Sequence, residues 1–157
     1  MSKSLAPGIR LGWVLCPPAL TEKVISLKGI LDRGSPYLDQ LALAALLRSG
    51  RYDRHLRRMR TLYAARRASL VQTLAAHAPT VRLSGLEAGF HAVAHLPDHL
   101  SEGEVIAGAH ARGVALHRMS SHRSDGAATP PQLVLGFGNV PEHSIREAVP
   151  LIADLLR

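Results

Sequence analysis

The sequence predicts an α/β chain whose last two thirds form a small α+β domain, with helices packed on an antiparallel or mixed sheet. Two patterns predict this fold. A long stretch of helical periodicity lies near the middle of the chain, and short apolar runs bounded by Gly and Pro alternate with amphipathic segments after it. With 157 residues, 46% of them hydrophobic, the chain is long enough to bury a core.

Residues 1–48 are predicted to hold one strand and two helices, without a sheet of their own. Residues 10–16 are apolar enough for a buried strand, and Pro17-Pro18 ends it. Residues 20–31 and 37–47 are predicted helices, closed by Gly34 and Gly50.

Residues 49–157 begin with a predicted helix over residues 52–77, because apolar side chains recur at helical spacing until Pro79. Residues 101–112 are a helix with a capping box of Ser101 and Glu104, and residues 141–156 are an amphipathic closing helix. Residues 120–131 are polar and predict a surface loop. The predicted strands are residues 81–83, 89–96, 114–117 and 133–137.

Composition excludes several classes of protein. Cys16 is the only cysteine, so internal disulfides and multi-cysteine metal sites are excluded, and the nine histidines show no HExxH-type spacing, so we expect no metal. No apolar run approaches the ~18 residues of a membrane span and no secretory signal is visible, so we expect no membrane contact and a cytoplasmic location. The net charge of +7 permits an acidic or nucleic-acid partner, but an arginine-rich composition also arises from GC-rich coding.

The segment SKSLAPGIRLG, residues 2–12, carries the chemistry. Lys3 lies seven residues before Arg10, and Pro7-Gly8 bends the chain between them. Two cations brought close together lower the pKa of the lysine, which favours a nucleophilic amine. The arginine offers a planar fork to a phosphate, and Ser2 and Ser4 add neutral donors.

This segment resembles the SK-x-x-x-PG-x-R-x-G signature of class I/II aminotransferases, proteins of the fold-type-I pyridoxal 5′-phosphate (PLP) class. The resemblance implies that Lys3 forms the internal aldimine with PLP and that Arg10 contacts the cofactor phosphate. Ser2 matches the serine before the lysine and would assist near the phosphate.

The rest of the chain is similar to MocR/GabR-type regulators, which fuse a winged helix-turn-helix to an aminotransferase-like domain. The similarity implies the C-terminal portion of the fold-type-I fold, with most of the large-domain sheet missing. Residues 1–48 would be a remnant of the large PLP-binding domain, and residues 49–157 the linking helix and the small domain. It implies a homodimer, a small amine or amino acid as ligand, and DNA contact only through an absent N-terminal domain. The segments that carry it are SPYLDQLALAALLRSGRYDRHLRRMRTLYAARR, LEAGFHAV, ARGVALHRMS and LVLGFGNVPEHSIREAV.

Two departures from the family pattern bear on activity. Aminotransferases usually carry a carboxylate-binding arginine at the position that matches Val134. The aspartate, the stacking aromatic and the Gly-rich loop that hold PLP would lie upstream of Met1. We therefore expect the isolated chain to be inactive, and three functions stay open: an effector-sensing regulator domain, a genuine aminotransferase, or a non-catalytic remnant that acts in subunit packing.

Other polar residues have simpler interpretations. We expect the histidines to lie on strand and loop surfaces, Cys16 to be a small buried hydrophobe, Tyr63 to pack on its helix and Asn139 to form a turn. An arginine run favours the solvated face of a helix over a DNA-binding surface. The residues concerned are His91, His95, His117 and His122, and then Arg48, Arg51, Arg54, Arg57, Arg58, Arg60, Arg66 and Arg67.

Overall fold

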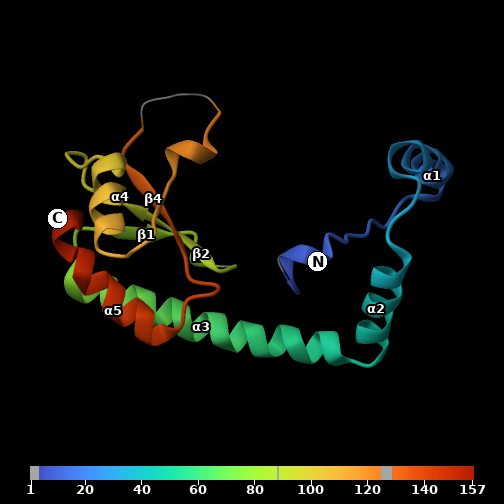
Figure 1. Cartoon of the computed structure of the whole chain (residues 1–157), viewed down its shortest axis with the longest axis horizontal. Helices are drawn as coiled ribbons and strands as arrows, with labels where there is room; N and C mark the ends of the chain where they lie inside the picture. Colours follow the sequence, from blue (N-terminus) through green and yellow to red (C-terminus); the bar gives the residue numbers. More distant parts are fainter. Residues whose placement is uncertain (1–3, 88, 125–128) are drawn as a thin grey trace. The chain divides into compact units, whose positions relative to one another are not determined.

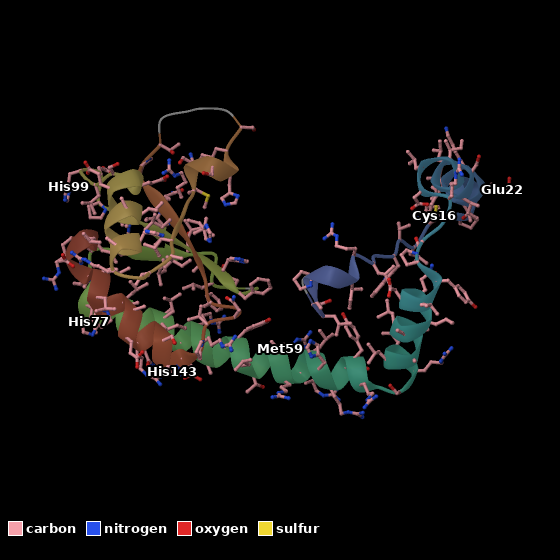
Figure 2. The ribbon with its side chains drawn as sticks, in the orientation of Figure 1. Cys16, Glu22, Met59, His77, His99 and His143 are labelled. Carbon is pink, nitrogen blue, oxygen red and sulfur yellow. The ribbon has the colours of Figure 1, made fainter. Side chains whose placement is uncertain are left out.

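The computed structural model describes residues 4–87, 89–124 and 129–157. The chain forms two compact units, Met1–Met59 and Arg60–Arg157, and Figure 2 marks Met59 where the first unit ends. The predicted domain boundary after residue 48 stays a prediction. Within the described ranges, no helix is both long and apolar enough to cross a membrane.

The first unit contains the two helices that the sequence predicts. Helix α1 spans Pro18–Asp32 and helix α2 spans Tyr37–Arg48 (Figure 1). The Thr21 hydroxyl donates to the carbonyl of Pro17 at 3.2 Å and closes the first turn of α1. Cys16 precedes that turn and is half-buried.

The predicted strand over residues 10–16 is wrong. This segment has no strand hydrogen bonding, and the four strands of the described chain all belong to the second unit. Trp13, Val14 and Leu15 are 69%, 74% and 97% exposed. An apolar run indicates burial in a sheet, but a strand forms only where a neighbour can pair with its backbone groups.

Helix α3, Arg51–His77, begins in the first unit and ends in the second. Leu70 and Leu74 are buried, which confirms the predicted apolar face over its C-terminal half. The amide of Ala78 donates to the carbonyl of Leu74 at 2.8 Å and completes the last turn before Pro79.

The second unit holds a four-stranded antiparallel sheet in the order β1-β2-β4-β3 (Figure 1). Strand β3 is shorter than predicted, because residues 114–116 lie outside the ladder. The strands are β1 (Arg82–Ser84), β2 (His91–His95), β3 (His117–Arg118) and β4 (Gln132–Gly136).

Two helices complete the second unit, α4 (Glu102–Ala111) and α5 (Glu142–Ile152), and both were predicted. The predicted capping box is wrong, because Ser101 is the N-cap residue of α4 but its side chain makes no capping bond. The short 3-10 helices are η1 (Pro7–Ile9), η2 (Ser120–His122) and η3 (Ala153–Leu156).

The core of the second unit lies between one face of the sheet and the helices. Along β2, Ala92 and Ala94 are 1% and 2% exposed, while the alternate positions are more open, as the period of a strand requires. Leu133 of β4 is 1% exposed. The core also includes Leu70, Leu74, Ala78, Val81, Leu96, Val105, Ala109, Phe137, Ile145, Val149, Ile152 and Leu156.

Candidate functional site

The bend predicted at Pro7-Gly8 is present as the 3-10 turn η1, in which the amide of Ile9 donates to the carbonyl of Ala6 at 3.3 Å. Arg10 ends the turn with φ of 49°, in the left-handed region. A residue with a Cβ atom pays roughly 1–2 kcal/mol to adopt this conformation. The side chain of Arg10 is exposed.

Ser4 is held by two side chains from the first turns of α3. The hydroxyl of Tyr52 donates to the Ser4 hydroxyl at 3.0 Å, and Nε2 of His55 lies 3.0 Å from the Ser4 carbonyl oxygen. A carbonyl only accepts, so Nε2 of His55 carries the hydrogen. Sequence reasoning missed both residues, although their spacing of three places them on one face of the helix.

Ser2 and Lys3 lie outside the described residues. Of the predicted site, the structure therefore describes Arg10 and the turn before it, together with Ser4 and its two contacts. The assignment of Lys3, Arg10 and Ser2 to a cofactor stays a prediction.

Val134, at the position where the family usually has an arginine, lies in β4 between two strands. Its partners in register are Val93 of β2 and His117 of β3, and its side chain is half-buried. Antiparallel partners directly opposite each other share a face of the sheet. None of these three residues carries a guanidinium or an amine that could pair with a substrate carboxylate.

A chain of hydrogen bonds crosses the same face of the sheet. Nη2 of Arg123 donates to Oε1 of Gln132 at 2.9 Å, and Nε2 of Gln132 donates to Nδ1 of His95 at 3.1 Å. Since a guanidinium only donates, it fixes the orientation of the amide, and the amide fixes the tautomer of His95. Nε2 of His95 then donates to the Ser84 hydroxyl at 2.7 Å. This histidine is half-buried and structural.

The remaining predicted surface histidines lie where the sequence indicates, because His91, His117 and His122 are exposed. His77, His99 and His143 also project outward from the second unit in Figure 2. Within the described ranges, no three His, Cys, Asp or Glu side chains gather as metal ligands.

The prediction that the arginine run lies on a wholly solvated helix face is wrong at two of its members. Nη1 of Arg66 donates to the carbonyl of Gly138, and Nη1 of Arg67 donates to that of Leu86 at 2.6 Å. Both side chains are half-buried, and they join α3 to loops of the second unit. Tyr63 packs against the ring of Phe90 with centroids 5.4 Å apart, as predicted for a packing residue. Arg48, Arg51, Arg54, Arg57, Arg58 and Arg60 are exposed.

Glu102 joins three segments of the second unit. Its carboxylate accepts from the hydroxyl of Ser120 at 2.7 Å and from the amide of Gln132 at 2.8 Å. Burial by itself would raise the pKa of Glu102, but these hydrogen bonds favour the charged form and lower its pKa below the ordinary value.

Comparison with known sequences shows the family. The sequence model of the family "Aminotransferase class I and II" matches residues 1–123. The HTH-type transcriptional regulator YhdI of Bacillus subtilis is 32% identical over 147 residues, which are 92% of this chain and 31% of that protein. The pyridoxine biosynthesis regulator PdxR of Corynebacterium glutamicum is 30% identical over 98% of this chain and 33% of its own length.

Solved aminotransferases share the fold. A multiple substrate aminotransferase from Thermococcus profundus superposes with a TM-score of 0.87 at 28% identity, over 99% of this chain and 38% of that one. A kynurenine aminotransferase of Pyrococcus horikoshii, solved in complex with PMP, has a TM-score of 0.86 at 25% identity, over 99% of this chain and 38% of that one. The fold is thus a portion of the aminotransferase fold, and the chain spans about a third of the length of the regulators.

Proposed function

Because the chain belongs to the class I and II aminotransferase family, we propose that it is part of a PLP-binding, effector-sensing domain of a MocR/GabR-type transcription regulator. The observation that carries the proposal is the segment of residues 2–12, in which Lys3 and Arg10 flank a turn. The proposal concerns a polypeptide of the relatives' length, which would supply the remaining cofactor contacts.

The chemistry of the donor set fits PLP. Family membership implies dependence on PLP, a cofactor that acts as an electron sink when bound. Lys3 would hold its aldehyde carbon covalently, Arg10 would pair with its phosphate, and Ser2 would add a neutral donor. Arg10 is exposed, which supports the phosphate contact because a phosphate can reach a guanidinium at the surface.

Sensing would use exchange of one amine for another. PLP would supply an aldehyde carbon that the amine of Lys3 holds, and an effector with a primary amine would compete with Lys3 for that carbon. On release, the amine of Lys3 would take up the proton that the incoming ammonium gives up. The released lysine would report the presence of the effector to the rest of the protein.

Two observations favour a regulator over an enzyme. Several relatives are transcription regulators, and Val134 stands where aminotransferases usually have a carboxylate-binding arginine. MocR of Rhizobium meliloti, a probable rhizopine catabolism regulatory protein, is 29% identical over 94% of this chain. A valine cannot pair with a substrate carboxylate as an arginine does. In this function the protein would be a homodimer and would bind DNA through a domain outside this chain.

A genuine aminotransferase is the second candidate. The aromatic-amino-acid aminotransferase 1 of Thermococcus litoralis is 28% identical over 99% of this chain, which supports it. Amino-group transfer to an oxo acid would identify an enzyme. An effector-dependent change in DNA affinity without transfer would identify a regulator.

The cofactor assignment is tested by titrating PLP into a polypeptide of the relatives' length and following the visible absorbance of the lysine-bound cofactor. Lys3→Ala should abolish the band and leave the fold intact, while Lys23→Ala should leave it unchanged. Arg10→Ala should weaken binding by roughly 1–3 kcal/mol, the scale of a lost charge-assisted contact. Unchanged affinity in Arg10→Ala would show that the phosphate assignment is wrong.

The 157-residue chain by itself should bind PLP weakly. One covalent bond and one phosphate contact leave the ring without stacking or nitrogen partners, and imines of exposed lysines are labile. A tight band at micromolar PLP that depends on Lys3 would contradict this expectation.

A further inference from the structure

Two long-range hydrogen bonds converge on Ser4, the residue that follows Lys3. The hydroxyl of Tyr52 reaches its side chain and Nε2 of His55 reaches its carbonyl oxygen, each at 3.0 Å. All three residues lie in the first unit, and the contacts span 48 and 51 positions of sequence.

The two bonds hold Ser4 at different points. One bond fixes the side-chain oxygen and the other fixes the carbonyl, so together they restrict both the position and the orientation of the residue. All three residues are half-buried, so water competes less for these polar groups than it would at an open surface. Either hydrogen bond alone would leave Ser4 free to rotate about the one atom that the bond holds.

Ser4 is the first residue that the structure describes, and it follows Lys3 directly in the sequence. After Ser4, the 3-10 turn leads to Arg10 in its left-handed conformation. The segment from Ser4 to Arg10 is therefore tied to α3 at one end and shaped by a turn at the other.

We propose that Tyr52 and His55 are positioning residues, which fix through Ser4 the backbone from which Lys3 reaches its partner; the use of Lys3 rests on the proposed function. A lysine that must meet an aldehyde carbon beside a phosphate held by Arg10 gains from a backbone that is already in place, because a misplacement of about 1 Å is enough to slow a covalent step strongly. Neither residue touches the reacting atoms, so neither is a catalytic residue.

The tether can be measured in the 157-residue chain without cofactor. The sequence has three lysines, Lys3, Lys23 and Lys28, so a lysine-specific endopeptidase has three sites. Cleavage after Lys3 requires Ser4 to leave α3 and enter the protease. Tyr52→Phe and His55→Ala should each accelerate this cleavage about fivefold, the effect expected for one lost hydrogen bond. Cleavage at the two sites in α1 should keep its rate.

Matched variants separate the hydrogen bonds from general damage to the fold. His55→Gln retains an N–H donor at the end of the side chain and should restore slow cleavage, which a merely space-filling role would not require. Tyr37→Phe removes a hydroxyl from an exposed tyrosine of the same unit, and His77→Ala removes an exposed histidine from the other end of α3. Both should cleave like the unaltered chain.

The positioning role is measured by reducing the chain with borohydride in millimolar PLP and mapping the modified lysines by mass spectrometry. The ratio of label on Lys3 to label on Lys23 should fall in Tyr52→Phe and His55→Ala and recover in His55→Gln. Unchanged cleavage in every variant would overturn the tether, and altered cleavage with an unchanged ratio would overturn the positioning role. If the unaltered chain resists cleavage after Lys3 but labels Lys3 no more than Lys23, the tether stands and the proposed use of Lys3 fails.

Discussion

The two units of the chain use similar apolar sequences in opposite ways. Among the described residues, all sixteen buried hydrophobic residues lie in the unit of residues 60–157, while thirteen of the fourteen exposed large hydrophobic residues lie in the unit of residues 1–59. Helices α1 and α2 bury no residue at all. An apolar side chain is therefore buried only when a second element covers it, and composition does not decide this.

The second unit supplies those covering elements from its own sequence. Four paired strands present a continuous face, and α3, α4 and α5 contribute side chains to one core. The described part of the first unit has two helices, a 3-10 turn and the irregular segment of residues 10–16, and it contains no strand. The two units should thus differ in association, in stability and in resistance to proteases.

The largest expected effect is self-association of the intact chain. Exposed apolar surface and backbone that lies outside any sheet both promote contact between copies. Deletion of the residues before Ser49 should relieve it and leave a monodisperse species in light scattering or sedimentation. A monodisperse monomer of the intact chain, with strong amide protection at residues 13–15, would show that this segment is already paired.

The contrast in burial predicts a contrast in mutational cost. Leu133→Ala, at a side chain that is 1% exposed, should lower the free energy of unfolding by roughly 2–5 kcal/mol. Leu31→Ala, at a side chain that is 84% exposed, should change it by less than about 0.5 kcal/mol. Urea unfolding followed by circular dichroism measures both, and equal effects would mean that Leu31 is covered in solution.

Proteolysis should separate paired backbone from unpaired backbone. A broad-specificity protease at low concentration should cut first within residues 120–131, because cleavage needs a segment that can leave the fold. Residues 125–128 lie outside the described chain. Strand β2 is paired on both sides, so early cleavage within residues 89–96 would contradict its place in the sheet.

The smallest expected effect is a pH dependence of the second unit. Hydrogen bonds in the folded state lower the pKa of Glu102, so its stabilisation is present above the ordinary glutamate pKa of about 4.3 and is lost as the pH falls through the lower folded value. Glu102→Gln should reduce the free energy of unfolding by about 1 kcal/mol at pH 7, and the difference should shrink as the pH falls through the lowered folded pKa.

Glu104→Gln is the matched control for this prediction, since Glu104 is exposed and lies in the same first turn of α4. Its effect on the free energy of unfolding at pH 7 should be smaller. A penalty for Glu102→Gln that stays constant as the pH falls would mean that the carboxylate charge does not contribute.

The helices and most of the sheet were predictable because their signals are local. Periodicity in α3 and α5 and alternation in β2 indicate which faces are buried, and the turn before Arg10 follows from Pro7-Gly8. The strand over residues 10–16 was predicted wrongly, because pairing depends on segments far away in sequence.

The contacts of the candidate site show the same limit. The motif of residues 2–12 indicates the chemistry of Lys3 and Arg10 but not the residues that hold it. Tyr52 and His55 meet Ser4 across about fifty positions of sequence, and Glu102 accepts from the amide of Gln132 thirty positions away. Periodicity and spacing contain no signal for such pairs, because only the folded chain brings them together.

The central claim is that Lys3, and not another lysine, is the residue that binds the cofactor. Borohydride reduction of PLP bound to a polypeptide of the relatives' length, followed by peptide mapping, tests it most directly. The account predicts one stoichiometric label on Lys3, absent from Lys3→Ala and unchanged in Lys23→Ala and Lys28→Ala. Label spread evenly over the three lysines of this chain, or retained in full by Lys3→Ala, would contradict it.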